Sequence, residues 1–257
     1  MTGREADWRD WRAARMAALA APDGWLNLID RIDLPPGLQT VGAAADNALQ
    51  LSAGPDHLGA VEIDSAGARL IDGAGVAHPF LPKEGAGPQL AVANLILEIH
   101  TVEGQPALRV RQVDHPARLS PPDIATFPFA PEWVVTARWE ALPEPEARAI
   151  DMVGGRGAEV RLTHRARFAH EGAEVVLLPT HWKDGRPMFV IRDATSGRET
   201  YGASRFLLGD VLDDRTIRLD FNRLHNPPCA FTEFAICPLP PAENRLFFPI
   251  RAGEMKP

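Results

Sequence analysis

The hydrophobic pattern of the chain changes near residue 24. Before it, the apolar residues Trp8, Trp11 and Leu19 recur at helical spacing among charged residues. The sequence Pro22-Asp23-Gly24 then supplies residues that commonly end a helix. This pattern predicts a helix within residues 1–22 that packs on the main body through its large apolar side chains.

After residue 24 the apolar period becomes two, as in a half-buried strand. Residues 133–141 show it most clearly, since Trp133 and Trp139 alternate with polar positions. Residues 95–100 and 107–113 predict one hairpin. Residues 175–182 and 187–192 predict another, across an Asp184-Gly185 pair suited to a type I′ turn. Weaker signals predict strands at residues 25–29, 48–51, 61–64, 158–163, 165–170, 216–221 and 246–250.

Short strands separated by Gly, Pro and Asp turns are typical of an all-β fold. We therefore expect a mostly β protein, a barrel or sandwich of short antiparallel strands with an N-terminal helix. All-β domains often reach 257 residues as a single unit. Residues 1–22 should form the helix, and residues 23–257 a single β-rich domain.

Charge and composition argue against some classes of binding partner. A formal net charge of −7 argues against a general nucleic-acid binder and against attachment to anionic lipid through a basic patch. The longest apolar run, residues 90–99, is interrupted by Asn94 and Glu98 and is too short for a membrane span. There is no signal-type segment, and two cysteines make no disulfide scaffold, so we expect a cytoplasmic protein. The oligomeric state stays open, and a homodimer is compatible with the sequence.

Polar residues gather in the C-terminal third, at strand ends and loops, where binding residues are often displayed. Arginines and side-chain amides there supply donors suited to phosphate or carboxylate, so a small anionic metabolite is the expected partner. The alternative is structural, because short polar side chains brace turns and an Arg205–Asp220 pair would stabilise a fold. The expected ligand-binding residues are Thr195, Tyr201, Arg205, Asp220, Asn222, Arg223, Asn226, Asn244 and Arg245.

Two residues are candidates for catalysis. Asp193 follows an apolar strand and precedes Thr195, and His181 lies beside Trp182 ahead of a predicted turn. Asp210 and Asp214 follow Asp193 at the spacing of a haloacid-dehalogenase-like metal motif. That fold is excluded, because the interval is too short for a βα unit.

The sequence offers one weak candidate for a metal site. His225, Cys229 and Cys237 are residue types that bind zinc, but no Cys-x2-Cys pair accompanies them. Both cysteines fit better as small buried apolar side chains that stay reduced. No cofactor is predicted, and a divalent metal is not supported by the sequence.

The C-terminal motifs resemble a known family. They include Arg192-Asp193-Ala194-Thr195-Ser196-Gly197, Leu219-Asp220-Phe221-Asn222-Arg223, Asn226-Pro227-Pro228-Cys229-Ala230-Phe231-Thr232 and Cys237-Pro238-Leu239-Pro240-Pro241. The set resembles the bacterial and archaeal family called domain of unknown function 1684. Upstream, Gly24-Trp25-Leu26 and Leu108-Arg109-Val110 also stand where the family has similar residues. Ser204 and His225 depart from its usual glycine and tyrosine.

The resemblance implies a β-rich fold. It carries phosphatase activity as a suspicion attached to the family rather than as an established role. We therefore expect a site for a small anion, with phosphohydrolysis of small metabolites as its enzymatic form. The alternative is a non-catalytic binding or scaffold domain. An enzyme should show an open pocket where Asp193, Arg205 and Asn222 converge, and a scaffold should show them closed by hydrogen bonds.

Overall fold

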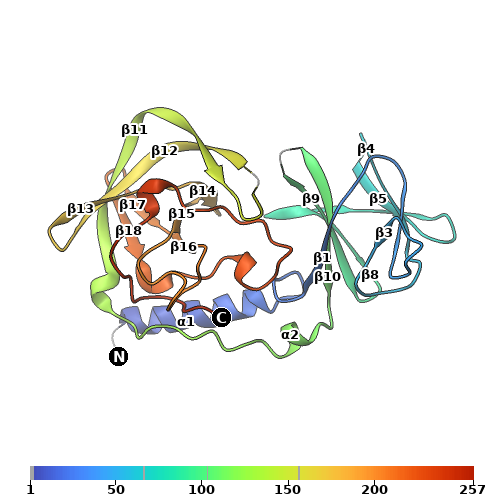
Figure 1. The fold of residues 1–257 in the computed structure, drawn as a ribbon, viewed down its shortest axis with the longest axis horizontal. Coiled ribbons are helices and arrows are strands. Elements are labelled where there is room, and N and C mark those ends of the chain that lie inside the picture. Colours follow the sequence, from blue (N-terminus) through green and yellow to red (C-terminus); the bar gives the residue numbers. More distant parts are fainter. Residues whose placement is uncertain (1–2, 66, 103, 156) are drawn as a thin grey trace. The chain divides into compact units, whose positions relative to one another are not determined.

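The structure is a computed structural model that describes residues 3–65, 67–102, 104–155 and 157–257 (Figure 1). It is mostly β, with antiparallel sheets and an N-terminal helix, which confirms the predicted fold class. Among the described strands no sheet closes into a barrel, so the sandwich is the predicted form that fits. In that part of the chain, no helix is long and apolar enough to cross a membrane.

The chain divides into two compact units. We call Met16–Pro121 the insert unit, and Met1–Arg15 with Pro122–Pro257 the terminal unit. The single β-rich domain expected over residues 23–257 stays a prediction.

Two five-stranded sheets make up the described part of the insert unit. One has the order β1-β10-β9-β8-β7 and the other the order β3-β2-β4-β5-β6. A short helix, α2 (Pro116–Leu119), ends the unit. The strands are β1 (Leu28–Asp33), β2 (Gln39–Gly42), β3 (Leu49–Gln50), β4 (Gly59–Asp64), β5 (Gly67–Ile71), β6 (Ala77–Pro79), β7 (Leu81–Lys83), β8 (Ala86–Val92), β9 (Leu95–Val102) and β10 (Gln105–Gln112).

The predicted hairpin at residues 95–113 is confirmed as the antiparallel pair β9 and β10. Its alternation has a clear cause. Leu97, Leu108 and Val110 belong to the buried apolar core of the insert unit. The positions between them carry Glu98 and Arg109, which point to the opposite face and are also buried. The face of the sheet opposite the apolar core therefore carries buried charged side chains.

The terminal unit contains a five-stranded sheet, β13-β12-β11-β18-β17, and a three-stranded sheet, β14-β15-β16, among its described residues. Its longest strands, β11 and β12, pair side by side as a bent ribbon (Figure 1). The strands are β11 (Val134–Asp151), β12 (Gly157–His170), β13 (Ala173–Leu177), β14 (His181–Lys183), β15 (Arg186–Ile191), β16 (Arg205–Leu208), β17 (Asp210–Asp213) and β18 (Thr216–Asp220). The 3₁₀ helices are η1 (Pro131–Trp133), η2 (Phe221–Arg223), η3 (Pro228–Ala230) and η4 (Ala242–Asn244).

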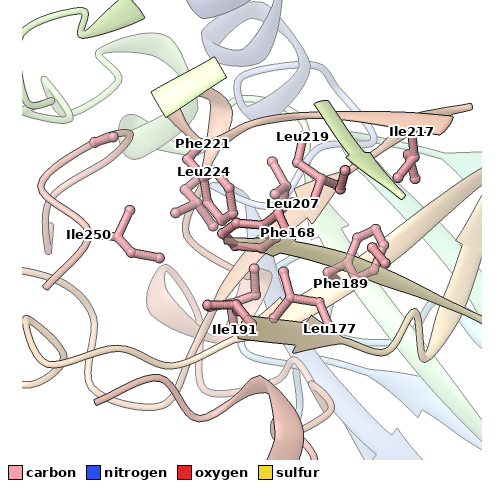
Figure 2. Packing of buried hydrophobic residues seen from close by; sticks show 14 of the residues in the cluster. Phe168, Leu177, Phe189, Ile191, Leu207, Ile217, Leu219, Phe221, Leu224 and Ile250 are labelled. Carbon is pink, nitrogen blue, oxygen red and sulfur yellow. The ribbon is translucent and has the colours of Figure 1, made fainter. Parts of the chain in front are cut away.

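Strands β11, β12, β13, β15, β16 and β18 all contribute side chains to the main apolar core of the terminal unit, and Figure 2 shows how its buried residues pack. Phe189, Leu207 and Phe221 are completely buried in it, with Leu177 and Ile217. Burying one such side chain contributes about 1.5–3 kcal/mol, so this cluster is the main source of stability for the unit.

Several strand predictions in the terminal unit need correction. The strand expected over residues 175–182 is two strands in different sheets, β13 and β14. The strands expected at residues 158–163 and 165–170 are one continuous strand, β12. Residues 246–250 form no strand, because the Ile250 amide and carbonyl bond to the side chains of Asp193 and Arg205 instead of a neighbouring strand. The turn at Asp184-Gly185 is confirmed, and both residues have positive φ, at 51° and 71°.

The N-terminal helix is confirmed as α1 (Gly3–Leu19). Its indole at Trp8 is buried and donates from Nε1 to the carbonyl oxygen of Asn222 at 2.9 Å. The Trp11 ring lies 6.1 Å from the ring of His225. The chain turns sharply after the helix, where a Cβ on Gly24 would lie 2.3 Å from the Leu19 carbonyl oxygen. Only glycine fits there.

Candidate functional site

The expected site centres on Asp193 and Arg205, which follow β15 and begin β16. The two strands are antiparallel neighbours, and Ile191 pairs with Arg205. This register brings the guanidinium to the carboxylate, and Nη2 donates to Asp193 Oδ2 at 2.8 Å. Each side chain is 1% exposed. The pair is therefore sealed from solvent.

The second oxygen of Asp193 is also occupied. Asp193 Oδ1 accepts from the Thr195 amide at 2.8 Å, from Thr195 Oγ1 at 2.6 Å and from the Ile250 amide at 3.3 Å. The Thr195 hydroxyl lies 2.8 Å from the Thr200 hydroxyl, and both threonines are completely buried. A carboxylate held this way orders the turn that follows it. The role of Asp193 as a nucleophile stays a prediction, and its carboxylate is not accessible to solvent.

The two terminal nitrogens of Arg205 also bind the C-terminal segment, whereas its Nε has no hydrogen-bond partner among the described residues. Nη1 donates to the carbonyl oxygens of Ala252 at 2.6 Å and Glu254 at 3.2 Å, and Nη2 donates to that of Ile250 at 2.9 Å. Burial lowers the pKa of Arg205, and the charge of Asp193 opposes that effect. The segment can approach because Gly253 has a φ of +79°, and a Cβ there would lie 2.4 Å from the Leu224 carbonyl oxygen. We call Asp193, Arg205 and these three carbonyl groups the C-terminal brace.

Asn244 joins separate strands in the same manner. Its Oδ1 accepts from the Leu178 amide at 2.8 Å. Its Nδ2 donates to the carbonyl oxygens of Leu178 and Val190, each at 2.9 Å. Leu178 lies between β13 and β14, where the predicted strand breaks. The Asn244 side chain therefore binds backbone groups that would otherwise pair with a neighbouring strand.

Asn222 and Asn226 also bind backbone groups. Asn222 exchanges two hydrogen bonds of 2.9 Å with the amide and carbonyl of Ala130. Asn226 Nδ2 donates to the Met255 carbonyl oxygen at 2.7 Å. Both asparagines are buried, at 1% and 0% exposure, so neither presents its amide to a ligand.

Tyr201 and Arg245 lie outside the C-terminal brace. The Tyr201 hydroxyl donates to the Cys229 carbonyl oxygen at 2.9 Å, and burial raises the pKa of this phenol. Arg245 is exposed, and its Nε donates to the Pro240 carbonyl oxygen at 3.2 Å. Their assignment as ligand-binding residues stays a prediction.

His181 lies on β14, and its Nδ1 is 2.9 Å from the Thr180 hydroxyl. Burial lowers the pKa of the imidazole. Among the hydrogen bonds of the described residues, none joins His181 to Asp193. The structure therefore does not assemble the two candidate catalytic residues into one acid–base pair.

One small cleft of the terminal unit does contain predicted residues. It is lined by Arg4 and Asp7 of α1, Val134 of β11, Arg218 and Asp220 of β18, and Arg223 of η2. Its volume of about 50 Å³ is room for a few waters or for one phosphate or carboxylate group. We call it the arginine cleft.

Two cations of the arginine cleft are paired with carboxylates, one inside the cleft lining and one outside it. Asp220 Oδ2 lies 3.2 Å from Arg223 Nε, and Asp220 Oδ1 accepts from the Asn222 amide at 3.1 Å. Arg218 binds Asp210 through Nε at 3.1 Å and Nη2 at 2.8 Å. Sequence reasoning found Asp220 and Arg223 but missed Arg4 and Arg218. Arg4 is remote in sequence, and Arg218 looks like the polar face of an ordinary strand.

The cysteines are free thiols, and Cys237 Sγ accepts a hydrogen bond from the Cys229 amide at 3.3 Å. His225 packs by its ring against Trp11 and Phe206. Within the described ranges, no cluster of three or more His, Cys, Asp or Glu residues could hold a metal ion.

These features define a mostly β protein in which buried polar side chains fasten the C-terminal segment to the sheets. The chain belongs to the family described as "Protein of unknown function (DUF1684)", which matches residues 122–255. That match falls within the terminal unit, and the upstream resemblance is not part of it. The resemblance seen in the sequence is thereby confirmed.

A solved structure similar to this chain is the solution NMR structure of an uncharacterized protein of Haloarcula marismortui. The two share 25% sequence identity, and the similarity covers 55% of this chain and 80% of that chain, with a TM-score of 0.44. Comparison with curated proteins gave no match.

Proposed function

We propose that the protein binds a small anion, through one phosphate or carboxylate group, in the arginine cleft. The observation that carries this proposal is the convergence of Arg4, Arg218 and Arg223 on one open space. Guanidinium groups match phosphate and carboxylate oxygens in a bidentate geometry. A ligand larger than one such group would extend out of the cleft, because sites for drug-sized molecules are usually about 300–1,000 Å³.

Binding is better supported than hydrolysis. The candidate nucleophile Asp193 is 1% exposed on its side chain and accepts four hydrogen bonds. The ligand we propose is thus a small phosphorylated or carboxylated metabolite that is held rather than cleaved. A cytoplasmic location and the absence of a nucleic-acid partner fit the net charge of −7 and the free cysteines, and they belong to the same proposal.

A second candidate function is that of a scaffold domain. The C-terminal brace favours it, because Asp193 and Arg205 are closed on one another and on backbone carbonyl groups. In this function the polar motifs lock an irregular segment over the sheets and have no ligand.

Calorimetric titration of the full chain with inorganic phosphate, acetate and a panel of phosphomonoesters distinguishes the two. We expect at least one anion to bind, and Arg223→Gln to weaken it about tenfold or more, as for loss of a hydrogen bond to a charged group. Arg251→Gln is the matched control, since Arg251 is 61% exposed and pairs with Glu199 away from the cleft lining. Equal affinity in both variants would reject the arginine cleft, and no binding by the parent would favour the scaffold.

The same panel tests hydrolysis. Turnover of p-nitrophenyl phosphate that is lost in a folded Asp193→Asn variant would restore the phosphohydrolase hypothesis. Turnover unaffected by that change would reject Asp193 as the nucleophile.

A further inference from the structure

One sheet of the insert unit carries a cluster of buried arginines that lies outside the C-terminal motifs. Strands β1, β10 and β9 lie next to one another, and their register sets Arg31 opposite Arg109, and Arg109 opposite Glu98. Directly opposed residues of antiparallel strands point to the same face of the sheet. Two guanidinium groups are therefore neighbours. Like charges in that position destabilise a sheet unless something compensates them.

A third guanidinium joins the same face from Arg111. Arg109 and Arg111 both pair with Glu98, and both lie over the Trp25 ring, at 5.2 and 5.7 Å from its centroid. The side chains of Arg31, Arg109 and Arg111 are 9%, 7% and 4% exposed, and that of Glu98 is 2% exposed. We call Arg31, Arg109 and Arg111 the arginine face.

The negative charge on this face is too small for its cations. Arg31 pairs with Asp33 at 2.8 Å, but Asp33 is 68% exposed and its charge is screened by solvent. Glu98 is then the buried carboxylate that Arg109 and Arg111 share. Buried charge without compensation is strongly destabilising in proteins.

The donors show the same imbalance. In the described part of this face, four buried nitrogens have no hydrogen-bond partner: the donors Arg31 Nε, Arg31 Nη2 and Arg109 Nε, and His100 Nδ1, whose role depends on the tautomer. Burial lowers the pKa of Arg109 to about 10 and that of His100 to about 4. At neutral pH Arg109 thus keeps its charge, and the imidazole is neutral. Unpaired buried donors are rare in native proteins, and they mark places where an acceptor belongs.

We propose that the arginine face binds a small oxyanion, a single carboxylate or phosphate group. Its oxygens accept from the Nε groups of Arg31 and Arg109, and its charge balances the cations that Glu98 leaves uncompensated. A neutral ligand would supply acceptors without charge, and a cation would add repulsion. This site lies in the insert unit and shares no residue with the arginine cleft.

An NMR titration can detect anion binding at the arginine side chains themselves. Nitrogen-15-labelled full-length protein is titrated with phosphate and with acetate, against sodium chloride at matched ionic strength. Buried arginine Nε–H groups give resolved NMR signals, which Arg31→Lys and Arg109→Lys variants assign. We expect the signals of Arg31 and Arg109 to shift saturably with one of the two anions and not with chloride.

Variants separate this site from its alternatives. Arg31→Gln should weaken the affinity about tenfold or more. Arg69→Gln is the matched control in the same unit, because Arg69 pairs with Glu62 and Asp64 on the other sheet. Arg223→Gln should not affect these signals, so failure of the arginine cleft leaves this proposal intact.

An unsaturated drift or no shift in the parent protein would overturn the proposal and assign the unpaired donors to water. Equal affinity of Arg31→Gln and Arg69→Gln would also overturn it. If Arg31→Gln does not fold, the titration of the parent decides alone, since a saturable shift at both assigned arginines supports the site and its absence rejects it.

Discussion

The two units bury arginine in different ways. In the terminal unit, Arg205 faces one carboxylate and three backbone carbonyl groups, which compensate its charge. In the insert unit, Arg109 and Arg111 share one buried carboxylate and Arg31 pairs with an exposed one, and Arg31 and Arg109 keep unpaired nitrogens among the described residues. Within the same described part of the chain, Arg205 also keeps one unpaired nitrogen, its Nε, but its charge is balanced by Asp193, whereas the arginine face has more buried positive charge than Glu98 can balance. Uncompensated buried charge, more than residue type or a single unpaired donor, separates a structural arginine from a candidate binding one.

The largest effect that tests this comparison is expected at Arg205. Arg205→Ala leaves Asp193 buried without its cation and frees the C-terminal segment. Breaking a buried pair typically costs about 3–5 kcal/mol. We expect that loss in the free energy of unfolding, measured by urea denaturation.

A double variant provides the control. Asp193→Asn with Arg205→Met removes both charges and should recover part of the stability of Arg205→Ala. The same denaturation curves test the single domain expected over residues 23–257, which predicts one transition that shifts as a whole. A fully stable Arg205→Ala protein would refute the structural role of the brace.

The next effect in size is a pH dependence with one contribution from each unit. Burial lowers the pKa of His225 to about 3 and that of His100 to about 4, from the ordinary value of 6.5. Below pH 6.5 the unfolded chain binds protons that the folded protein does not, so acid favours unfolding. Each histidine should remove about 1.4 kcal/mol of stability per pH unit between 6.5 and its folded pKa.

Unfolding free energies at pH 7, 6 and 5 measure this slope. His225→Phe keeps an aromatic ring against Trp11 and Phe206 but cannot titrate, so its slope should be shallower than that of the parent. His100→Gln should reduce the slope similarly, whereas His57→Gln, at an exposed position, should not. Identical slopes in all four proteins would show that neither histidine is held neutral.

The smallest expected effect is that of metal removal. Hydrogen bonds and apolar packing account for the brace, so Cys229 and Cys237 should remain reduced and metal-free. A thiol titration of the unfolded protein should find two thiols, the number in the sequence, and EDTA should leave the melting temperature unchanged. One zinc per chain in elemental analysis would mean that the C-terminal segment is stabilised differently.

Local patterns in the sequence predicted the local structure well. The alternation around Trp133 and Trp139 predicted β11, and Asp184-Gly185 predicted a turn that the backbone angles bear out. The break at Leu178 could not be predicted, because its hydrogen-bond partner Asn244 lies 66 residues away. The alternation of apolar and polar residues indicates which face of a strand is buried. It does not indicate where a distant side chain replaces the backbone hydrogen bonds between strands.

The sequence could single out polar residues for a candidate site, but it could not show whether their side chains are open to a ligand or already hydrogen-bonded. The sequence singled out Asp193, Arg205 and Asn244, which prove to be buried and hydrogen-bonded. Their partners are largely backbone groups such as the Ala252 carbonyl, which every residue possesses and no sequence pattern marks. Arg31 and Arg109 were passed over for the converse reason, since each lies in a strand of ordinary alternating pattern.

The hydrogen bonds of α1 bear on the order of events during synthesis. Trp8 bonds to Asn222, and Arg15 bonds to Glu254, so the helix spans separations of 214 and 239 residues. A ribosome makes this helix before its partners, and the whole insert unit emerges in between. The insert unit can fold as it appears, since domains form in the order of translation. The helix must wait with its tryptophans uncovered, and that interval is when the nascent chain is most exposed to aggregation and to chaperones.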